Sequence, residues 1–243
     1  MTPAPVVVAL DAASSRLTLA VEREGTVAAR HLDGARQHTA QVLTLLDAAL
    51  GEVGASVREV TAVITGDGPG SFTGLRVASS VAKALAWGRA EVEWLTGPSL
   101  LTRVPLDEGE PRRVLALSDA LRGELYAGCW QLGAGAVTAV DPPARAMPPH
   151  ALAGFGAMDA VVGTIPEALV GAVRAATGVE PVTGEAALPD ARRLLALRHW
   201  RGGLARVADP GRWHPEYGRP AEAQAVWERK HGKPLPDPGH TAR

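Results

Sequence analysis

Cysteine and aromatic residues are scarce in this chain of 243 residues. The single cysteine, Cys129, excludes an intramolecular disulfide and a cysteine-based metal cluster, which is typical of proteins in a reducing compartment. Aromatic residues make up 4% of the sequence but apolar residues 46%, so the core must be built mainly from Ala, Val and Leu on closely packed elements. This composition argues against disorder and favours one large domain or two small ones.

Long hydrophobic runs and net charge are also missing. No stretch of about 18 uninterrupted apolar residues occurs, and the first five residues carry no basic segment leading into an apolar one. We therefore expect a cytoplasmic protein with no membrane association. The 25 basic and 26 acidic residues nearly cancel, so the whole molecule lacks the positive field of a protein that holds nucleic acid by itself.

The first hundred residues show a regular order of strand and helix patterns. An apolar run over 6–10 ends at Asp11 and predicts a central strand. The further segments are alternating strands over 17–23 and 26–32, a helix over 37–53, a strand over 60–65, a helix over 73–87 and a short strand over 92–95. The resulting order β-β-β-α-β-α is that of a ribonuclease-H-like half in the actin, Hsp70 and sugar-kinase superfamily.

A weaker second copy of this pattern follows. Strands are expected over 114–119, 125–130, 136–140 and 160–163, a helix over 191–204 and a short helix over 220–231. The chain therefore divides into an N-terminal half over 1–104, a linker over 105–111, an abbreviated C-terminal half over 112–220, and a basic helix with a disordered tail over 221–243. The predicted fold class is α/β, with two ribonuclease-H-like halves as in actin and Hsp70.

A glycine-rich loop over 66–76 joins the strand at 60–65 to the next helix. Its glycines allow close backbone approach, and its hydroxyl residues suit a helix N-cap, so the helix start could bind an anion. The spacing matches neither a Walker A motif nor a dinucleotide fingerprint. The candidate residues for a phosphate site, or for a purely structural corner, are Asp11, Gly68, Gly70, Ser71, Thr73, Gly74 and Arg76.

The same loop carries a specific resemblance. The decamer Gly68–Val77, with the opening 9–13, Gln37-His38-Thr39, the segment 119–126 and the tail 215–220, resembles the TsaB (YeaZ) family. The resemblance is strong over about residues 1–130 and thinner afterwards. Members of this family are paralogues of TsaD, which transfers a threonylcarbamoyl group to adenosine in tRNAs reading codons that begin with A.

The resemblance implies a scaffold and activator of TsaD that has no catalytic role of its own. In TsaD, two histidines one helical turn apart bind a metal ion. Alignment by Gly97-Pro98-Ser99 places Leu100 and Val104 at those positions, and neither side chain can bind a metal. The resemblance further implies the P-loop ATPase TsaE as a third member and no intrinsic cofactor, and it leaves open ATP or ADP at the interface with TsaD.

The helices over 38–50 and 73–86 are the expected partner surface, because in the family they pack against those of TsaD and can also serve a homodimer. Small residues on the second helix would let another helix approach closely, although burial against the chain's own sheet explains its Val and Leu residues equally well. The expected interface residues are His38, Thr39, Val42, Leu43, Leu46, Thr73, Val77, Ala78, Val81, Ala82 and Leu85. Ala82→Arg should then block association and leave the monomer folded.

Two other features leave alternatives open. Between Arg192 and Lys233, ten basic residues stand against four acidic ones, which forms either a solvated face or a contribution to tRNA phosphate contacts in the complex. The competing function is a stand-alone enzyme, either a small-molecule kinase of the same superfamily or a peptidase. A kinase should carry two glycine-bearing phosphate loops, whereas the turn over 12–15 has no glycine.

Overall fold

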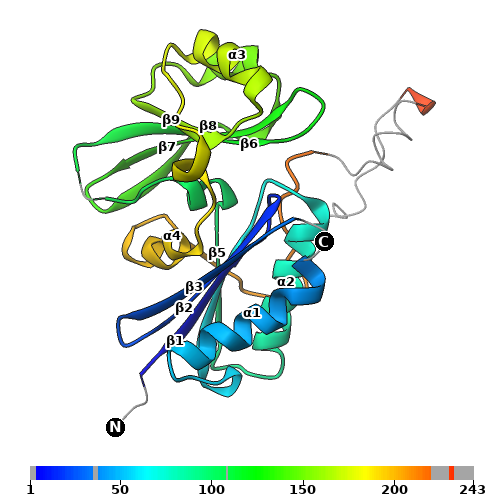
Figure 1. The fold of residues 1–243 in the computed structure, drawn as a ribbon, viewed down its shortest axis with the longest axis vertical. Helices are drawn as coiled ribbons and strands as arrows, with labels where there is room; N and C mark the ends of the chain where they lie inside the picture. The colour runs from blue at the N-terminus through cyan, green and yellow to red at the C-terminus, as the bar shows by residue number, and fades with distance from the viewer. Residues whose placement is uncertain (1–3, 35–37, 108, 220–229, 233–243) are drawn as a thin grey trace, which may run out of the picture.

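The computed structural model describes residues 4–34, 38–107, 109–219 and 230–232, and shows two mixed sheets stacked with helices between and outside them (Figure 1). The first sheet has the order β10-β5-β4-β1-β2-β3. Its strands are β1 (Val6–Asp11), β2 (Arg16–Arg23), β3 (Thr26–Asp33), β4 (Val60–Gly66), β5 (Glu93–Gly97) and β10 (Ala205–Arg206). β1, β2 and β3 pair antiparallel in two hairpins, and two crossovers add β4 parallel to β1 and β5 parallel to β4.

Two long helices cover one face of this sheet. They are α1 (His38–Glu52) and α2 (Phe72–Ala86). Their apolar stripes pack on the residues of β1 that point to that face, Val6, Val8 and Leu10, and form one core cluster. α2 starts where the Ser71 side chain accepts a hydrogen bond from the Gly74 amide, as its N-cap position predicts.

The second sheet has the order β8-β7-β6-β9. Its strands are β6 (Arg112–Asp119), β7 (Leu125–Gly133), β8 (Ala136–Met147) and β9 (Ala160–Thr164), and β6 again pairs antiparallel with β7 and parallel with β9. A 3-10 helix, η4 (Pro149–Phe155), stands where the first half has α1. α3 (Glu167–Thr177), which the sequence patterns did not reveal to us, covers the outer face of this sheet.

A middle layer joins the two halves. It contains η3 (Ser99–Arg103) and α4 (Ala191–Ala196), which pack with the inner faces of both sheets in one apolar cluster. The helix expected over 191–204 begins where predicted, but it ends earlier, at Ala196. After α4 the chain makes a 3-10 turn, η6 (Leu197–His199), and Gly202 adopts a φ of 76°, which a right-handed helix does not allow.

From α4 onward the chain has returned to the first half, because β10 pairs with β5. β10 lies in the stretch 112–220 that the sequence analysis assigned to the second half, but it forms the edge strand of the first sheet. The short helix expected over 220–231 and the tail over 221–243 fall almost wholly outside the described residues.

The topology confirms the predicted fold class. Both halves repeat the order of strands 3-2-1-4, with the second strand antiparallel to the first and the fourth parallel to it, which is the ribonuclease-H-like arrangement. The second half is abbreviated, as expected. Within the described part of the chain, no helix combines the length and apolar character needed to cross a membrane.

Candidate functional site

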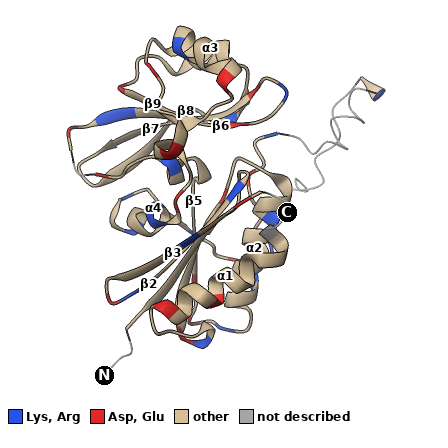
Figure 2. Ribbon diagram, in the orientation of Figure 1, with Lys and Arg blue, Asp and Glu red and all other residues tan. Residues whose placement is uncertain are grey.

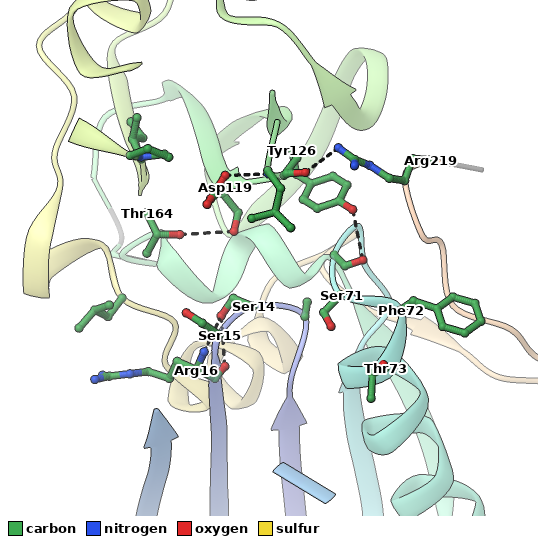
Figure 3. A pocket seen from close by; sticks show the side chains of 18 of the residues that line it. Ser14, Ser15, Arg16, Ser71, Phe72, Thr73, Asp119, Tyr126, Thr164 and Arg219 are labelled. Carbon is green, nitrogen blue, oxygen red and sulfur yellow. Dashed lines mark hydrogen bonds between the residues drawn. The ribbon is translucent and has the colours of Figure 1, made fainter. Parts of the chain in front are cut away.

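A cleft of 1460 Å³ lies between the two halves. Its walls come from the turn after β1, the start of α2, the ends of β6 and β9, and the segment after β10 (Figure 3). Side chains from both halves face it, among them Ser14, Ser71, Asp119, Tyr126 and Thr164. A cleft at the carboxyl ends of parallel strands is the usual ligand position in α/β folds, so this cleft is the candidate site of the protein.

The basic side chains of the cleft are already paired. Arg16 donates two hydrogen bonds of 2.7 Å to the Asp33 carboxylate, and Arg219 donates to Glu124 at 3.0 Å. The lining also includes the acidic residues Asp119 and Glu185. Among the described residues that line the cleft, positive and negative side chains therefore balance, which does not favour a polyphosphate.

The glycine loop does not form an open cradle, because the chain itself fills it. The Ser71 amide donates to the Ala13 carbonyl at 2.7 Å. A Cβ on Gly70 would lie 2.3 Å from that carbonyl oxygen, and one on Gly74 would lie 1.8 Å from the Ala12 carbonyl oxygen. These glycines therefore let the loop and α2 pack against the turn after β1, which supports the structural interpretation of the loop.

Asp11 is fully buried. One carboxylate oxygen accepts a 2.6 Å hydrogen bond from the Ser99 hydroxyl and the other a 3.4 Å hydrogen bond from the Ala13 amide. Burial raises the pKa of Asp11, while the Ser99 hydrogen bond and the nearby Arg103 guanidinium act in the opposite direction. This carboxyl group is thus engaged inside the protein and has no exposed surface toward the cleft.

Arg103 links this buried group to the second half. Its side chain is 1% exposed, and it donates to the Ser99 carbonyl at 3.3 Å and to the Ser118 hydroxyl, on β6, at 3.0 Å. Burial lowers the pKa of Arg103 to about 10, and the charge of Asp11 opposes that shift. Ser118 in turn lies 3.3 Å from the Thr164 hydroxyl in the cleft wall.

Asp67, in the glycine loop, is a second carboxyl group whose pKa is raised. Burial, together with the charges of Asp11 and Glu216, raises the pKa of Asp67 to about 7. Its backbone amide donates to the Gly97 carbonyl at 2.9 Å, which fixes the loop to the end of β5. Near neutral pH this side chain therefore exists in both protonation states.

The predicted partner residues divide into two groups in the structure. Val42, Leu46, Ala78, Val81, Ala82 and Leu85 are buried against the chain's own sheet, so they do not form an exposed surface in the monomer. The expectation that Ala82→Arg leaves the monomer folded is thereby corrected, since Ala82 is fully buried. Thr39, Leu43 and Thr73 are exposed and Val77 is half-buried; the side chain of His38 lies outside the described residues.

The positions aligned with metal ligands are apolar core positions. Leu100 and Val104 are both fully buried in the middle layer. Throughout the described ranges, no three His, Cys, Asp or Glu side chains gather in a way that could hold a metal ion. Leu100 and Val104 have no atom that could bind the metal ion that the resemblance assigns to these positions in TsaD.

Sequence reasoning missed several residues of the cleft. Gly70, Ser71 and Thr73 were predicted and do line it, but Arg16, Tyr126, Thr164 and Arg219 were not singled out. Tyr126 and Arg219 belong to the segments 119–126 and 215–220 that carried the family resemblance, which was the available signal. Thr164 is the last residue of β9, and a polar residue at the end of a buried strand could have drawn attention.

Comparisons with known proteins agree with this architecture. The model of the TsaD family, described as tRNA N6-adenosine threonylcarbamoyltransferase, matches residues 32–154. The tRNA threonylcarbamoyladenosine biosynthesis protein TsaB of Escherichia coli K12 is 35% identical over 125 residues, covering 49% of this chain and 52% of that protein. TsaB of Bacillus subtilis 168 is 26% identical over 142 residues, covering 58% and 62%. The match thus spans about half the length of the curated relatives.

Solved structures cover more of the chain. A Pseudomonas aeruginosa protein described as similar to peptidase YeaZ has a TM-score of 0.70 and 28% identity, and the match covers 88% of this chain and 100% of that one. A second structure, YeaZ from the same organism, has a TM-score of 0.65 and 25% identity over 88% and 99%. The chain therefore belongs to the family described by the TsaD model and, within it, to the TsaB (YeaZ) group.

Proposed function

We propose that this protein is a non-catalytic activator of tRNA N6-threonylcarbamoyladenosine formation, acting through a heterodimer with TsaD. The observation that carries the proposal is the combination of a TsaD family match over 32–154 with buried leucine and valine at positions 100 and 104. The family match supports a fold related to that of the enzyme over this region, and the resemblance aligns these two apolar core side chains with the enzyme's metal ligands. Such a chain is suited to pair with the enzyme rather than to replace it.

The surface proposed for TsaD is the outer face of α1 and α2. It is formed by exposed residues at helical spacing, namely Thr39, Ala40, Leu43 and Asp47 on α1 and Thr73, Arg76, Ser80, Ala84 and Trp87 on and after α2. Leu43 is 64% exposed and Trp87 is 85% exposed, which is unusual for large apolar side chains. Figure 2 shows that α1 and α2 are uncharged over most of their length.

The TsaD family match supports this choice of surface. Residues 32–154 include both helices, so TsaD carries a related helix pair. Two related folds can join through equivalent surfaces about a pseudo-two-fold axis, as identical subunits do about a true one. The small side chains of Ala40, Ser80 and Ala84 would allow close helix contact.

The proposed complex also includes TsaE, tRNA and a nucleotide. TsaE would be the third protein, and tRNA would be bound by the complex rather than by this chain alone, because the charge of the chain is nearly balanced. ATP or ADP would bind at the interface with TsaD. In the basic region over 192–233, part of which lies outside the described residues, Arg192, Arg198 and Arg219 already pair with acidic side chains of this chain, which favours a solvated face over phosphate contacts.

Reconstitution of the reaction tests the function. Purified TsaD, TsaE, tRNA and a source of the threonylcarbamoyl group should modify adenosine only when this chain is added back. We expect no modification by this chain without TsaD. Full modification without this chain would overturn the proposal.

A matched pair of substitutions on α2 tests the surface. Ala84 is exposed and Ala82, two residues earlier, is fully buried. Ala84→Arg should leave the melting temperature unchanged and abolish heterodimer formation in size-exclusion chromatography. Ala82→Arg should unfold the monomer, because a charge in the core costs several kcal/mol. Heterodimer formation by Ala84→Arg as in the unmodified chain would show that TsaD binds elsewhere.

A further inference from the structure

The segment Trp213–Arg219 runs from the first half to the second and contacts both. On the first half, the Trp213 ring packs on the Trp94 ring at a centroid distance of 4.8 Å. The Glu216 amide donates to the Asp67 carbonyl at 2.7 Å, and the Glu216 carbonyl lies against Gly68 so closely that a Cβ there would be 1.9 Å from its oxygen. This part of the segment is thus locked onto the glycine loop.

On the second half, the same segment is held by β7, β8 and the turn between β6 and β7. The Ala146 amide donates to the Gly218 carbonyl at 3.1 Å. Arg219 donates to the Ala120 carbonyl at 2.7 Å and lies over the Tyr126 ring at 5.4 Å. Tyr126 also reaches back to the glycine loop, since its hydroxyl is 3.4 Å from the Gly70 carbonyl.

The segment also covers the beginning of α2. The Tyr217 ring lies 4.6 Å from the Phe72 ring, and the Arg76 guanidinium lies 4.3 Å from the same Phe72 ring. Arg76 further donates to the Tyr217 hydroxyl at 3.4 Å. Phe72, whose ring points away from the other side chains of the cleft in Figure 3, is therefore held by Tyr217 and Arg76 together.

We propose that Trp213–Arg219 is a strap that fixes the start of α2 relative to the second half and so sets the pose of the helix offered to TsaD. The effect on TsaD binding rests on the proposed function, whereas the strap itself rests only on the contacts described above. The strap is hydrogen-bonded to the glycine loop and to β8 and packs on the Phe72 ring, so it restrains the opening of the cleft. The glycine loop then transmits this restraint to α2, because the Ser71 cap and the first turn of the helix belong to it.

If Trp213–Arg219 acts as a strap, two matched substitutions, Gly218→Ala and Gly178→Ala, should have different effects. Gly218 has a φ of 70°, and a Cβ there would lie 2.4 Å from Pro69. Gly178, at the end of α3, has a φ of 71° and open space around the added Cβ. Both alanine variants bear the same backbone penalty, but only Gly218→Ala pushes the strap off the loop.

We would measure the affinity of the full chain for TsaD and amide hydrogen exchange over 66–76. Gly218→Ala should weaken binding roughly tenfold and speed exchange of this segment roughly tenfold, whereas Gly178→Ala should change neither. Faster exchange with unchanged affinity would overturn the positioning role. Unchanged exchange would overturn the strap itself.

A second variant covers the case in which Gly218→Ala does not fold. Arg219→Met removes the bonds to Ala120 and Glu124 and keeps the aliphatic stem of the side chain. It should also speed exchange over 66–76 and weaken binding, and wild-type values for both would reject the strap. If the unmodified chain does not bind TsaD at all, the proposed function fails, while the exchange experiment still decides whether the strap exists.

Discussion

At the scale of the residue, the Asp67 carboxyl group is stabilised in its protonated form by the fold. Burial and the neighbouring charges of Asp11 and Glu216 raise its pKa from 3.8 to about 7. In the unfolded chain the group ionises near pH 4, whereas in the folded chain it ionises only near pH 7. Ionisation therefore favours unfolding, so this group lowers stability progressively as the pH rises from about 4 to 7, and the full cost is present above pH 7.

Asp67→Asn should remove this cost. We expect the variant to gain about 4 kcal/mol of unfolding free energy at pH 8 and little at pH 4, because the amide resembles the protonated carboxyl group. Urea unfolding of the variant and the parent at several pH values measures the difference. An equal difference at pH 4 and pH 8 would show that the group does not titrate differently in the folded state.

At the scale of the element, the sequence predicted what depends on local pattern and missed what depends on packing. α1, α2 and the strands of the first half appear where their apolar periodicity placed them. α3 was missed although Pro166 precedes it and Gly178 ends it with a left-handed conformation. The pairing of β10 with β5 could not be read locally, because its partner strand lies about a hundred residues earlier in the chain. The early end of α4 had a local signal, Gly202, whose φ is positive.

The candidate site shows the same limit. The glycine loop was recognised, but its spacing alone left open a phosphate cradle or a structural corner. The carbonyls of Ala12 and Ala13 that fill it come from another turn, brought there only by the fold. Likewise, helical spacing gave the faces of α2, but only the position of the sheet determined that Ala82 is buried and Ala84 exposed.

The turn between β6 and β7 provides a prediction at this scale. Leu121 and Arg122 both have positive φ, 64° and 57°, which is unfavourable for side chains with a Cβ. Leu121 is 67% exposed, so its side chain gains little from burial. Leu121→Asn should stabilise the protein by about 0.5–1 kcal/mol, since asparagine tolerates this conformation.

Leu121→Ala is the matched control for that turn. Alanine loses the exposed side chain but keeps the same backbone strain, so its unfolding free energy should remain close to that of the parent. Thermal or urea unfolding measures both variants. Equal stability of the asparagine and alanine variants would mean that the turn stores no strain.

At the scale of the whole molecule, the two halves are joined by a buried charge as well as by the apolar middle layer. Arg103 extends from η3 to Ser118 of the second sheet, and its charge lies near that of Asp11 in the first. Removing one partner of a buried pair is costly, because the other charge remains in a medium that solvates it poorly. Arg103→Met should therefore destabilise the protein by about 3 kcal/mol at pH 8.

The pH dependence of that loss identifies its cause. Arg103 lowers the pKa of Asp11, so without it this carboxyl group takes up a proton more readily in the folded state. The destabilisation by Arg103→Met should accordingly shrink as the pH falls. Adding Asp11→Asn to Arg103→Met should restore most of the stability at pH 8, since neither charge then remains buried. A double variant no more stable than Arg103→Met would indicate that Arg103 acts through its hydrogen bonds to Ser99 and Ser118 rather than through Asp11.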